Sequence, residues 1–312
     1  ADARRGVRNS VRLSPSGFQE THHRPDYDRP VSRGVRGETN VSGDIVQAKT
    51  SLVTVTHNSA AALRTFWDDY REEPGATHEW IVVDNASKDG SAEIAEALGA
   101  RVIRLSENVG FSAANNVGAA ASTGEVVGFV NPDVRVDTRQ LPVLATLARE
   151  TGGLVAPQLL NVDGTLQPNG RGYPLLSAKI RNRVRGGDLS YLLYATGVTP
   201  RAVAWVMGAA VFAERTVFDR IGGWDPKFFM YYEDKDLCLR AWHAGVPVLV
   251  DPTIRWTHEW ARATKGMNLV AWRREIASMA RFYGRYPEFL QGERASIRAH
   301  QELHRSVHPT HV

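Results

Sequence analysis

Cysteine and long apolar runs are what this 312-residue sequence has least of. Cys238 is the only cysteine, so the chain cannot form an internal disulfide and offers no thiolate cluster for zinc. No apolar run approaches the roughly 20 residues that are needed to cross a bilayer. The N-terminus is rich in arginine and lacks the apolar centre of a signal peptide. These absences lead us to expect a protein of the reducing cytoplasm.

Glycine-rich phosphate loops are also missing. Neither G-x-G-x-x-G nor G-x-x-x-x-G-K-[ST] follows an apolar run, which argues against dinucleotide oxidoreductases and P-loop nucleotidases. The formal net charge is only +4, and mild attraction to anionic lipid or phosphorylated substrates explains it as well as nucleic acid does. We therefore expect no specific nucleic acid partner.

Residues 1–48 differ in composition and in apolar pattern from the rest of the chain. Their arginines are scattered among proline, serine and glycine without an apolar period, so the segment cannot bury enough surface to offset its ordering entropy. We expect a disordered basic extension, and a solvated tail is favoured over a functional arm.

From Thr50 onwards, apolar runs alternate with helical patterns, which predicts an α/β fold with a mostly parallel sheet. The central run is Val126–Val130, a strand buried on both faces that stops at Asn131-Pro132-Asp133. Expected strands precede it at 51–56, 79–83 and 101–105, separated by helical segments.

Polar residues follow three of these expected strands, at 57–59, 84–89 and 131–133. Each group alone is typical of a loop. Together they indicate a shared crevice beyond the carboxyl ends of parallel strands, where ligands bind in open α/β sheets. Acids after two of the strands suit a nucleotide and a divalent cation.

A second group of acids, Glu233, Asp234 and Asp236, begins a predicted helix in the second half of the chain. Charges that stabilise the helix N-terminus would explain all three, and an ion pair with Arg240 would explain Asp236. For Glu233 and Asp234 the preceding aromatic run changes the balance, because partial desolvation raises a carboxylate pKa towards the range of a general base.

Two basic segments allow more than one interpretation. Residues 178–193 are a solvated helix, or they meet a membrane surface or a phosphorylated acceptor. Residues 269–289 form an amphipathic helix that covers the core, which is slightly favoured, or lies against the cytoplasmic leaflet. We expect 302–312 to be frayed.

Several motifs together resemble glycosyltransferase family 2, which has the GT-A fold, and in particular its rhamnosyltransferase-like branch. They are V-T-V-T-H-N-S at 53–59, V-V-D-N-A-S-K-D-G-S at 82–91, N-V-G-F at 108–111 with two asparagines at 115–116, N-P-D at 131–133, and G-G-W-D-x-x-F-F-x-x-x-E-D-x-D-L at 222–237. The resemblance covers roughly 51–265. It implies a Rossmann-like, mostly parallel nucleotide-binding sheet fused to an acceptor-binding half, followed by C-terminal helices. We accordingly divide the chain into a GT-A domain at 49–266, with halves at 49–135 and 136–266, and a C-terminal helix and tail at 267–312.

The resemblance also implies roles for individual residues. It assigns nucleotide-sugar contacts to Thr56, His57, Asn58, Asp84, Asn85, Ser87, Asn108, Gly110, Phe111, Asn115 and Asn131. It implies acceptor contacts for Gly208, Trp224, Asp225, Phe229, Asp236 and Arg240. The general base is assigned to Asp234, with Glu233 as the alternative.

Asp133 takes the place of the last acid of a degenerate D-x-D motif and is the expected ligand of Mg²⁺ or Mn²⁺. Asn131 replaces the first acid, which leaves room for one other protein ligand. A lone histidine at a strand end is usually structural, but the resemblance puts a metal-binding histidine at His258, and imidazole would supply that ligand.

The expected activity is inverting transfer of a sugar, foremost rhamnose from dTDP-rhamnose, to a saccharide or polyprenyl-linked acceptor in cell-envelope or polysaccharide synthesis. If the protein is an enzyme with another donor, the alternatives are UDP-glucose, UDP-galactose and UDP-N-acetylglucosamine. If it is not an enzyme, the alternative is a non-catalytic protein that binds sugar nucleotides or glycans, although such a protein would not need Glu233 and Asp234. Peripheral contact with the inner face of the plasma membrane and oligomerisation stay open.

Overall fold

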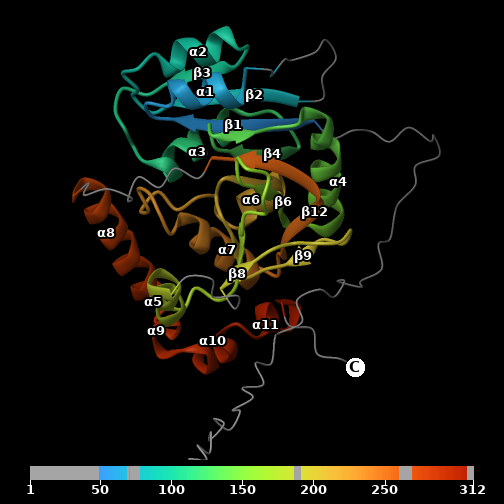
Figure 1. The fold of residues 1–312 in the computed structure, drawn as a ribbon, viewed down its shortest axis with the longest axis vertical. Coiled ribbons are helices and arrows are strands. Elements are labelled where there is room, and N and C mark those ends of the chain that lie inside the picture. The colour runs from blue at the N-terminus through green and yellow to red at the C-terminus, as the bar shows by residue number, and fades with distance from the viewer. Residues whose placement is uncertain (1–48, 69, 71–77, 186–190, 260–268, 308–312) are drawn as a thin grey trace, which may run out of the picture.

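A computed structural model describes residues 49–68, 70, 78–185, 191–259 and 269–307 (Figure 1). The extension expected at 1–48 lies outside the described residues. The fold is α/β, and its main sheet has nine strands. The strands of that sheet are β1 (Thr50–Thr56), β2 (His78–Asp84), β3 (Arg101–Arg104), β4 (Val126–Val130), β5 (Val134–Arg135), β6 (Leu154–Leu160), β9 (Arg201–Ala202), β11 (Ala210–Glu214) and β12 (Val248–His258).

The order β3-β2-β1-β4-β11-β6-β12-β5 puts β4 near the middle of the sheet, while β9 pairs with β12. β1, β2, β3 and β4 run parallel, so the carboxyl ends of β1, β2 and β4 lie on one edge, as the sequence predicted. β11 is antiparallel and joins this half to the parallel pair of β6 and β12. Gly128 of β4 lies opposite Phe212 of β11, and a Cβ there would be only 2.2 Å from the phenylalanine ring.

Helices cover both faces of the sheet because the strands are apolar on both. They are α1 (Ala60–Phe66), α2 (Ser91–Ala97), α3 (Phe111–Ala121), α4 (Leu141–Thr151), α5 (Leu176–Arg185), α6 (Arg215–Arg220), α7 (Glu233–His243), α8 (Leu269–Arg285), α9 (Glu288–Gln291), α10 (Glu293–Ala299) and α11 (Gln301–Val307), with a short 3₁₀ turn at Thr138–Gln140. One core cluster joins a face of the sheet to α1, α2 and α4. The other joins the opposite face to α3, α6, α7 and α8.

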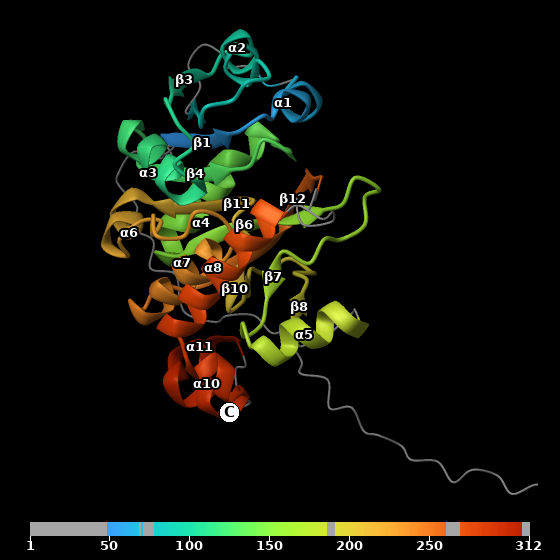
Figure 2. The same cartoon turned by 90° about the vertical axis from the view of Figure 1, so that its left-hand side faces the viewer.

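A small antiparallel sheet of β7 (Gly170–Arg171), β8 (Leu192–Leu193) and β10 (Trp205–Val206) lies beside the second half of the main sheet. Figures 1 and 2 show α9, α10 and α11 gathered at the end of the molecule remote from β3, whereas α8 runs along its side. None of the helices in the described ranges combines the length and the apolar character that a membrane span requires.

The C-terminus corrects one expectation. Fraying was predicted from residue 302, but α11 continues to Val307 and buries Leu303 and Val307. The polar and histidine-rich composition concealed a contact made through only one face of the helix. Residues 308–312 of that prediction lie outside the described residues.

Candidate active site

The loops after β1 and β2 are tied to each other by hydrogen bonds. Asp84, at the end of β2, is buried and accepts hydrogen bonds from Thr56 Oγ1 at 3.0 Å and from the backbone N–H of Ser87 at 3.1 Å. The backbone N–H of Asn58 donates to Ser87 Oγ at 2.9 Å, and His57 Nδ1 lies 2.8 Å from the carbonyl oxygen of Asn85. One hydrogen-bonded pair of loops therefore holds five of the residues predicted to contact the nucleotide: Thr56, His57, Asn58, Asp84 and Ser87.

Asn85 connects this pair of loops to the loop before α3. Its Nδ2 donates to Asn108 Oδ1 at 3.0 Å, and its Oδ1 accepts from the backbone N–H of Val109 at 2.9 Å. Gly110 has φ +91°, and a Cβ there would meet the carbonyl oxygen of Phe229 at 2.7 Å. That carbonyl accepts from the N–H of Phe111, also at 2.7 Å, so the loop before α3 is in direct contact with the loop that precedes α7.

Asn115 and Asn131 are fixed more locally. Asn115 is buried, and its Nδ2 donates to the carbonyl of Phe111 one turn earlier in α3. The backbone N–H of Asn131 donates to the carbonyl of Ala209 at 2.8 Å, which continues the pairing of β4 with β11. Trp67 Nε1 donates to the carbonyl of Pro132 at 3.1 Å and anchors the turn that carries Asp133.

The two predicted metal ligands come together at the end of β4. His258, the last residue of β12, pairs with Val134 of β5, and its Nε2 lies 3.5 Å from Asp133 Oδ1. That Asp133 oxygen is buried and has no hydrogen bond partner among the described residues.

Gln167 fixes which nitrogen of His258 faces Asp133. Gln167 Nε2 donates to Asn161 Oδ1 and to the carbonyl of His258, so its Oε1 is the acceptor that lies 2.6 Å from His258 Nδ1. Nδ1 must then carry the proton, and in the neutral ring Nε2 presents its lone pair to Asp133.

A lone pair that faces a buried carboxylate oxygen suits a cation, because both atoms are ligands and neither donates a hydrogen bond. One carboxylate and one imidazole are suitable ligands for Mn²⁺. Mg²⁺ prefers oxygen ligands, so for that ion the carboxylate of Asp133 is the suitable one. Across the described ranges, no cluster of three or more His, Cys, Asp or Glu side chains could enclose a metal. Among the described residues, Asp133 and His258 are the pair that could hold the metal.

The N-terminus of α7 is held in an unusual backbone conformation. Tyr231 and Tyr232 have φ values of +67° and +69°, which non-glycine residues rarely adopt. Asn58 and Ala86 are the other two non-glycine residues with positive φ in the described chain, and they lie in the loops after β1 and β2. The strained positions thus border the predicted site.

Glu233 and Asp234 follow directly and have different surroundings. Burial, reinforced by the negative charge of Asp234, raises the pKa of Glu233 to about 8, and Glu233 Oε2 has no hydrogen bond partner among the described residues. Asp234 is partly exposed, and its Oδ1 lies 3.7 Å from Lys235 Nζ. The Lys235 ammonium is 4.0 Å from the centre of the Trp205 ring and 4.3 Å from that of Tyr232.

Gly208 connects the two sides of the site. A Cβ on Gly208 would lie 3.5 Å from the Trp224 ring, 3.6 Å from Asp234 Cβ and 3.7 Å from the Phe111 ring. The next residue, Ala209, binds the backbone of Asn131. Gly208 thus lies close to Asp234, and its neighbour Ala209 is bonded to the turn that carries Asp133.

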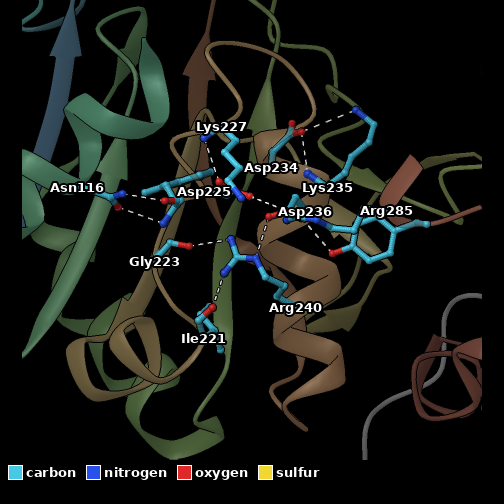
Figure 3. Close-up of polar contacts among 12 residues, drawn as sticks. Asn116, Ile221, Gly223, Asp225, Lys227, Asp234, Lys235, Asp236, Arg240 and Arg285 are labelled. Atoms are coloured by element: carbon cyan, nitrogen blue, oxygen red, sulfur yellow. Dashed lines mark hydrogen bonds and ion pairs between the residues drawn. The ribbon is translucent and has the colours of Figure 1, made fainter. Parts of the chain in front are cut away.

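Asp225, Asp236 and Arg240 form a separate network (Figure 3). Asp236 is completely buried and accepts from Arg240 Nε at 2.8 Å, Arg285 at 2.6 Å and Tyr286 Oη at 3.0 Å. Arg285 also binds Asp225 at 2.7 Å, and the Arg240 guanidinium donates to the carbonyls of Ile221 and Gly223. The ion pair between Asp236 and Arg240 that the helical spacing suggested is present, and their acceptor contacts stay predictions.

Sequence reasoning missed Gln167 and Lys235. Gln167 lies in a polar, glycine-rich stretch without periodicity, and no sequence signal connects it to a histidine 91 positions later. Lys235 could have been noticed as a lysine between two acids, but its burial against Trp205 depends on a contact 30 residues away, between α7 and β10.

A family model, Glycosyl transferase family 2, matches residues 51–207. N-acetylglucosaminyl-diphospho-decaprenol L-rhamnosyltransferase of Mycobacterium tuberculosis is 25% identical over 236 residues, which are 68% of this chain and 76% of that protein. The dTDP-rhamnosyl transferase RfbF of Shigella flexneri is 25% identical over 186 residues, 57% of this chain and 58% of that one.

Two solved structures share the fold. GalNAc-T7 with UDP, GalNAc and Mn²⁺ superposes with a TM-score of 0.54 at 18% identity, covering 85% of this chain and 55% of that one. The mannosyltransferase PcManGT of Pyrobaculum calidifontis, with GDP-Man and Mn²⁺, gives 0.53 at 17% identity, covering 83% and 69%. The GT-A fold expected from the motifs is confirmed, and the chain belongs to glycosyltransferase family 2, as an enzyme that takes its sugar from a nucleotide donor.

Proposed function

We propose that this glycosyltransferase is metal-dependent and inverting, and that it transfers rhamnose from dTDP-rhamnose to a saccharide or polyprenyl-linked saccharide acceptor in cell-envelope or polysaccharide synthesis. The two rhamnosyltransferase relatives support the choice of sugar. UDP-glucose, UDP-galactose and UDP-N-acetylglucosamine are the competing donors. The observation that carries the proposal is the facing pair of Asp133 Oδ1 and His258 Nε2, with Gln167 fixing the imidazole.

The donor nucleotide binds, in this proposal, against the loops after β1 and β2. Asp84 faces the base, where its carboxylate is already oriented by Thr56 and Ser87. Asn85 and Asn108 hold the adjoining loop, so the pocket is organised before the nucleotide arrives. Such preorganisation lowers the entropy cost of binding.

Asp133 and His258 would hold Mg²⁺ or Mn²⁺ together with the diphosphate of the donor. A bound dication stabilises the negative charge that develops on the leaving diphosphate. The contribution of Gln167 is to keep the Nε2 lone pair available and the ring in place, as hydrogen bonds behind metal-binding histidines commonly do.

Asp234 acts as the general base that removes the proton of the acceptor hydroxyl while the oxygen attacks the anomeric carbon. Its partial exposure close to Gly208 gives an acceptor access to it, whereas Glu233 is buried beside it. Since the raised pKa keeps Glu233 largely protonated at neutral pH, Glu233 adds little negative charge to the site.

The acceptor lies, in this proposal, over Gly208, Trp224 and Phe229. Asp225, Asp236 and Arg240 act by positioning, because their charged groups are occupied with one another and with Arg285. That network clamps the start of α7, which carries Asp234.

The test is a panel of sugar nucleotides incubated with Mg²⁺ or Mn²⁺ and scored by donor hydrolysis, which needs no acceptor. We expect dTDP-rhamnose to be hydrolysed fastest, and chelation of the metal to stop the reaction. Faster hydrolysis of a UDP-sugar would replace the proposed donor. Tight donor binding without turnover, even with acceptor saccharides present, would favour the non-catalytic binding protein.

A further inference from the structure

The inner face of α8 supports the loop that carries the proposed base. The Arg274 guanidinium lies 4.0 Å from the centre of the Phe229 ring. One turn later, Ser278 Oγ donates to the carbonyl of Met230 at 2.8 Å, and one turn after that the Phe282 ring packs against Tyr232 with centroids 5.3 Å apart. These three α8 residues are spaced four apart, so a single stripe of the helix contacts the segment just before Glu233 and Asp234.

Other positions of α8 are apolar and exposed. Leu269 and Ile276, on the side away from that stripe, are 76% and 53% exposed, and Arg273 is exposed beside them. Val270, one turn before Arg274, is 57% exposed, and Arg281 is exposed as well. α5 has the same character, with Ile180 and Val184 at 54% and 78% exposure. The helices lie on one side of the molecule, on the left in Figure 1 and facing the viewer in Figure 2.

An ion pair joins the two helices. Lys179 of α5 binds Glu275 of α8 at 2.9 Å, and the exposed isoleucines Ile180 and Ile276 each follow directly after a member of this pair. We call the exposed side chains of Ile180, Val184, Leu269, Val270, Arg273, Ile276 and Arg281 the α5–α8 surface.

The charge around this surface is positive. α5 carries four basic residues and no acid. α8 carries four arginines and one acid; Arg274 lies against Phe229 and Arg285 binds Asp225 and Asp236, so Arg273 and Arg281 are the arginines it adds to this surface. That acid is Glu275, which is already paired with Lys179. Aliphatic side chains interleaved with arginine match the interface of a bilayer that contains anionic lipid, since apolar groups enter the acyl boundary and cations stay with the headgroups.

We propose that the α5–α8 surface docks this enzyme onto a bilayer containing anionic phospholipid. The inference rests on the proposed function, because a membrane surface is where a polyprenyl-linked acceptor is presented. The same helix touches lipid on one face and the loop from Phe229 to Tyr232 on the other, so docking brings the base within reach of headgroup-linked saccharides. A second copy of the chain is a poorer occupant, because a two-fold pair would bring like charges together.

Flotation of the full chain with vesicles tests the proposal. One set is phosphatidylcholine alone and the other is phosphatidylcholine mixed with phosphatidylglycerol. We expect binding to the anionic vesicles that weakens with salt, and a loss of about tenfold or more in the double variant Ile180→Ser/Ile276→Ser. Arg273→Gln/Arg281→Gln should also bind several-fold more weakly. The matched control is Val143→Ser/Val162→Ser, which removes two valines that are 51% and 65% exposed elsewhere; it should bind like the wild type. The arginine-rich residues 1–48 are present in every protein compared, so their contribution cancels.

Donor hydrolysis, measured without vesicles, keeps this test separate from the proposed function, and the isoleucine variant should retain it. Equal binding of wild type and isoleucine variant to anionic vesicles would overturn the proposal, as would absence of binding by the wild type. A wild-type dimer that dissociates in the isoleucine variant, without vesicle binding, would assign the surface to self-association instead.

Discussion

The hydrogen bond from His258 Nδ1 to Gln167 Oε1 provides a sharp test of the metal site. Gln167→Met preserves much of the side-chain length and removes the acceptor. His258 is only 4% exposed, so its Nδ1–H would be left buried without a partner, at a cost of about 1–3 kcal/mol. The imidazole can avoid that cost by moving its proton to Nε2, where it would donate to Asp133 Oδ1, 3.5 Å away, and block both ligand atoms.

We therefore expect Gln167→Met to weaken Mn²⁺ binding about 10- to 100-fold. This corresponds to about 1.4–2.7 kcal/mol. The assay is titration with Mn²⁺ in the presence of a nucleoside diphosphate, followed by the electron paramagnetic resonance signal of free Mn²⁺.

The matched control is Asn161→Ser, which removes the other partner of Gln167 Nε2 and leaves the contact with His258 intact. Urea unfolding of each variant separates loss of metal binding from loss of fold. If Gln167→Met bound Mn²⁺ as tightly as the wild type, Gln167 would not position the histidine.

Three further changes probe the base and the sheet. Asp234→Asn should retain donor binding by calorimetry while turnover onto an acceptor falls about 10²-fold or more; near-normal turnover would remove Asp234 from the role. The pKa of Glu233 is 4.5 ordinarily and about 8 in the folded protein. The stability that the neutral carboxyl group contributes is therefore fully present below about pH 4.5 and is lost as the pH rises through about 8. The free energy of unfolding of the wild type should therefore fall relative to Glu233→Gln between those values, and parallel pH profiles in urea unfolding would contradict the burial argument. Gly128→Ala should destabilise by about 1–3 kcal/mol, because its Cβ would overlap the Phe212 ring; an unchanged urea midpoint would show that β4 and β11 can separate at little cost.

The first half of the fold was predictable because its signals are local. Continuous apolar runs marked β1, β2 and β4, and the polar residues after them were expected to meet on one edge, as the parallel pairing of these strands now places them. The second half was harder. β12 continues from Val248 to His258 through Pro252, with a register shift between Asp251 and Arg255. A bulge of this kind depends on the neighbouring strand rather than on the local sequence.

The candidate site was also predictable only in part. Residues at strand ends, such as Asp84 and Asp133, could be predicted because the apolar runs show where the strands stop. Side chains that bind them from distant parts of the chain could not be predicted. Asp236 was interpreted through Arg240, four residues on, whereas Arg285 and Tyr286 reach it from α8 and the residue after it, about 50 positions later. Such contacts follow from how α8 packs, and no periodicity in the sequence encodes them.

The most direct test of the account is a crystal structure of the chain with Mn²⁺ and a nucleoside diphosphate. The account predicts the metal bonded to the carboxylate of Asp133 and to Nε2 of His258, with the base of the nucleotide beside Asp84 and the carboxylate of Asp234 facing the diphosphate across a space that fits one sugar. A metal bound to neither Asp133 nor His258, or a nucleotide bound away from the ends of β1, β2 and β4, would contradict it.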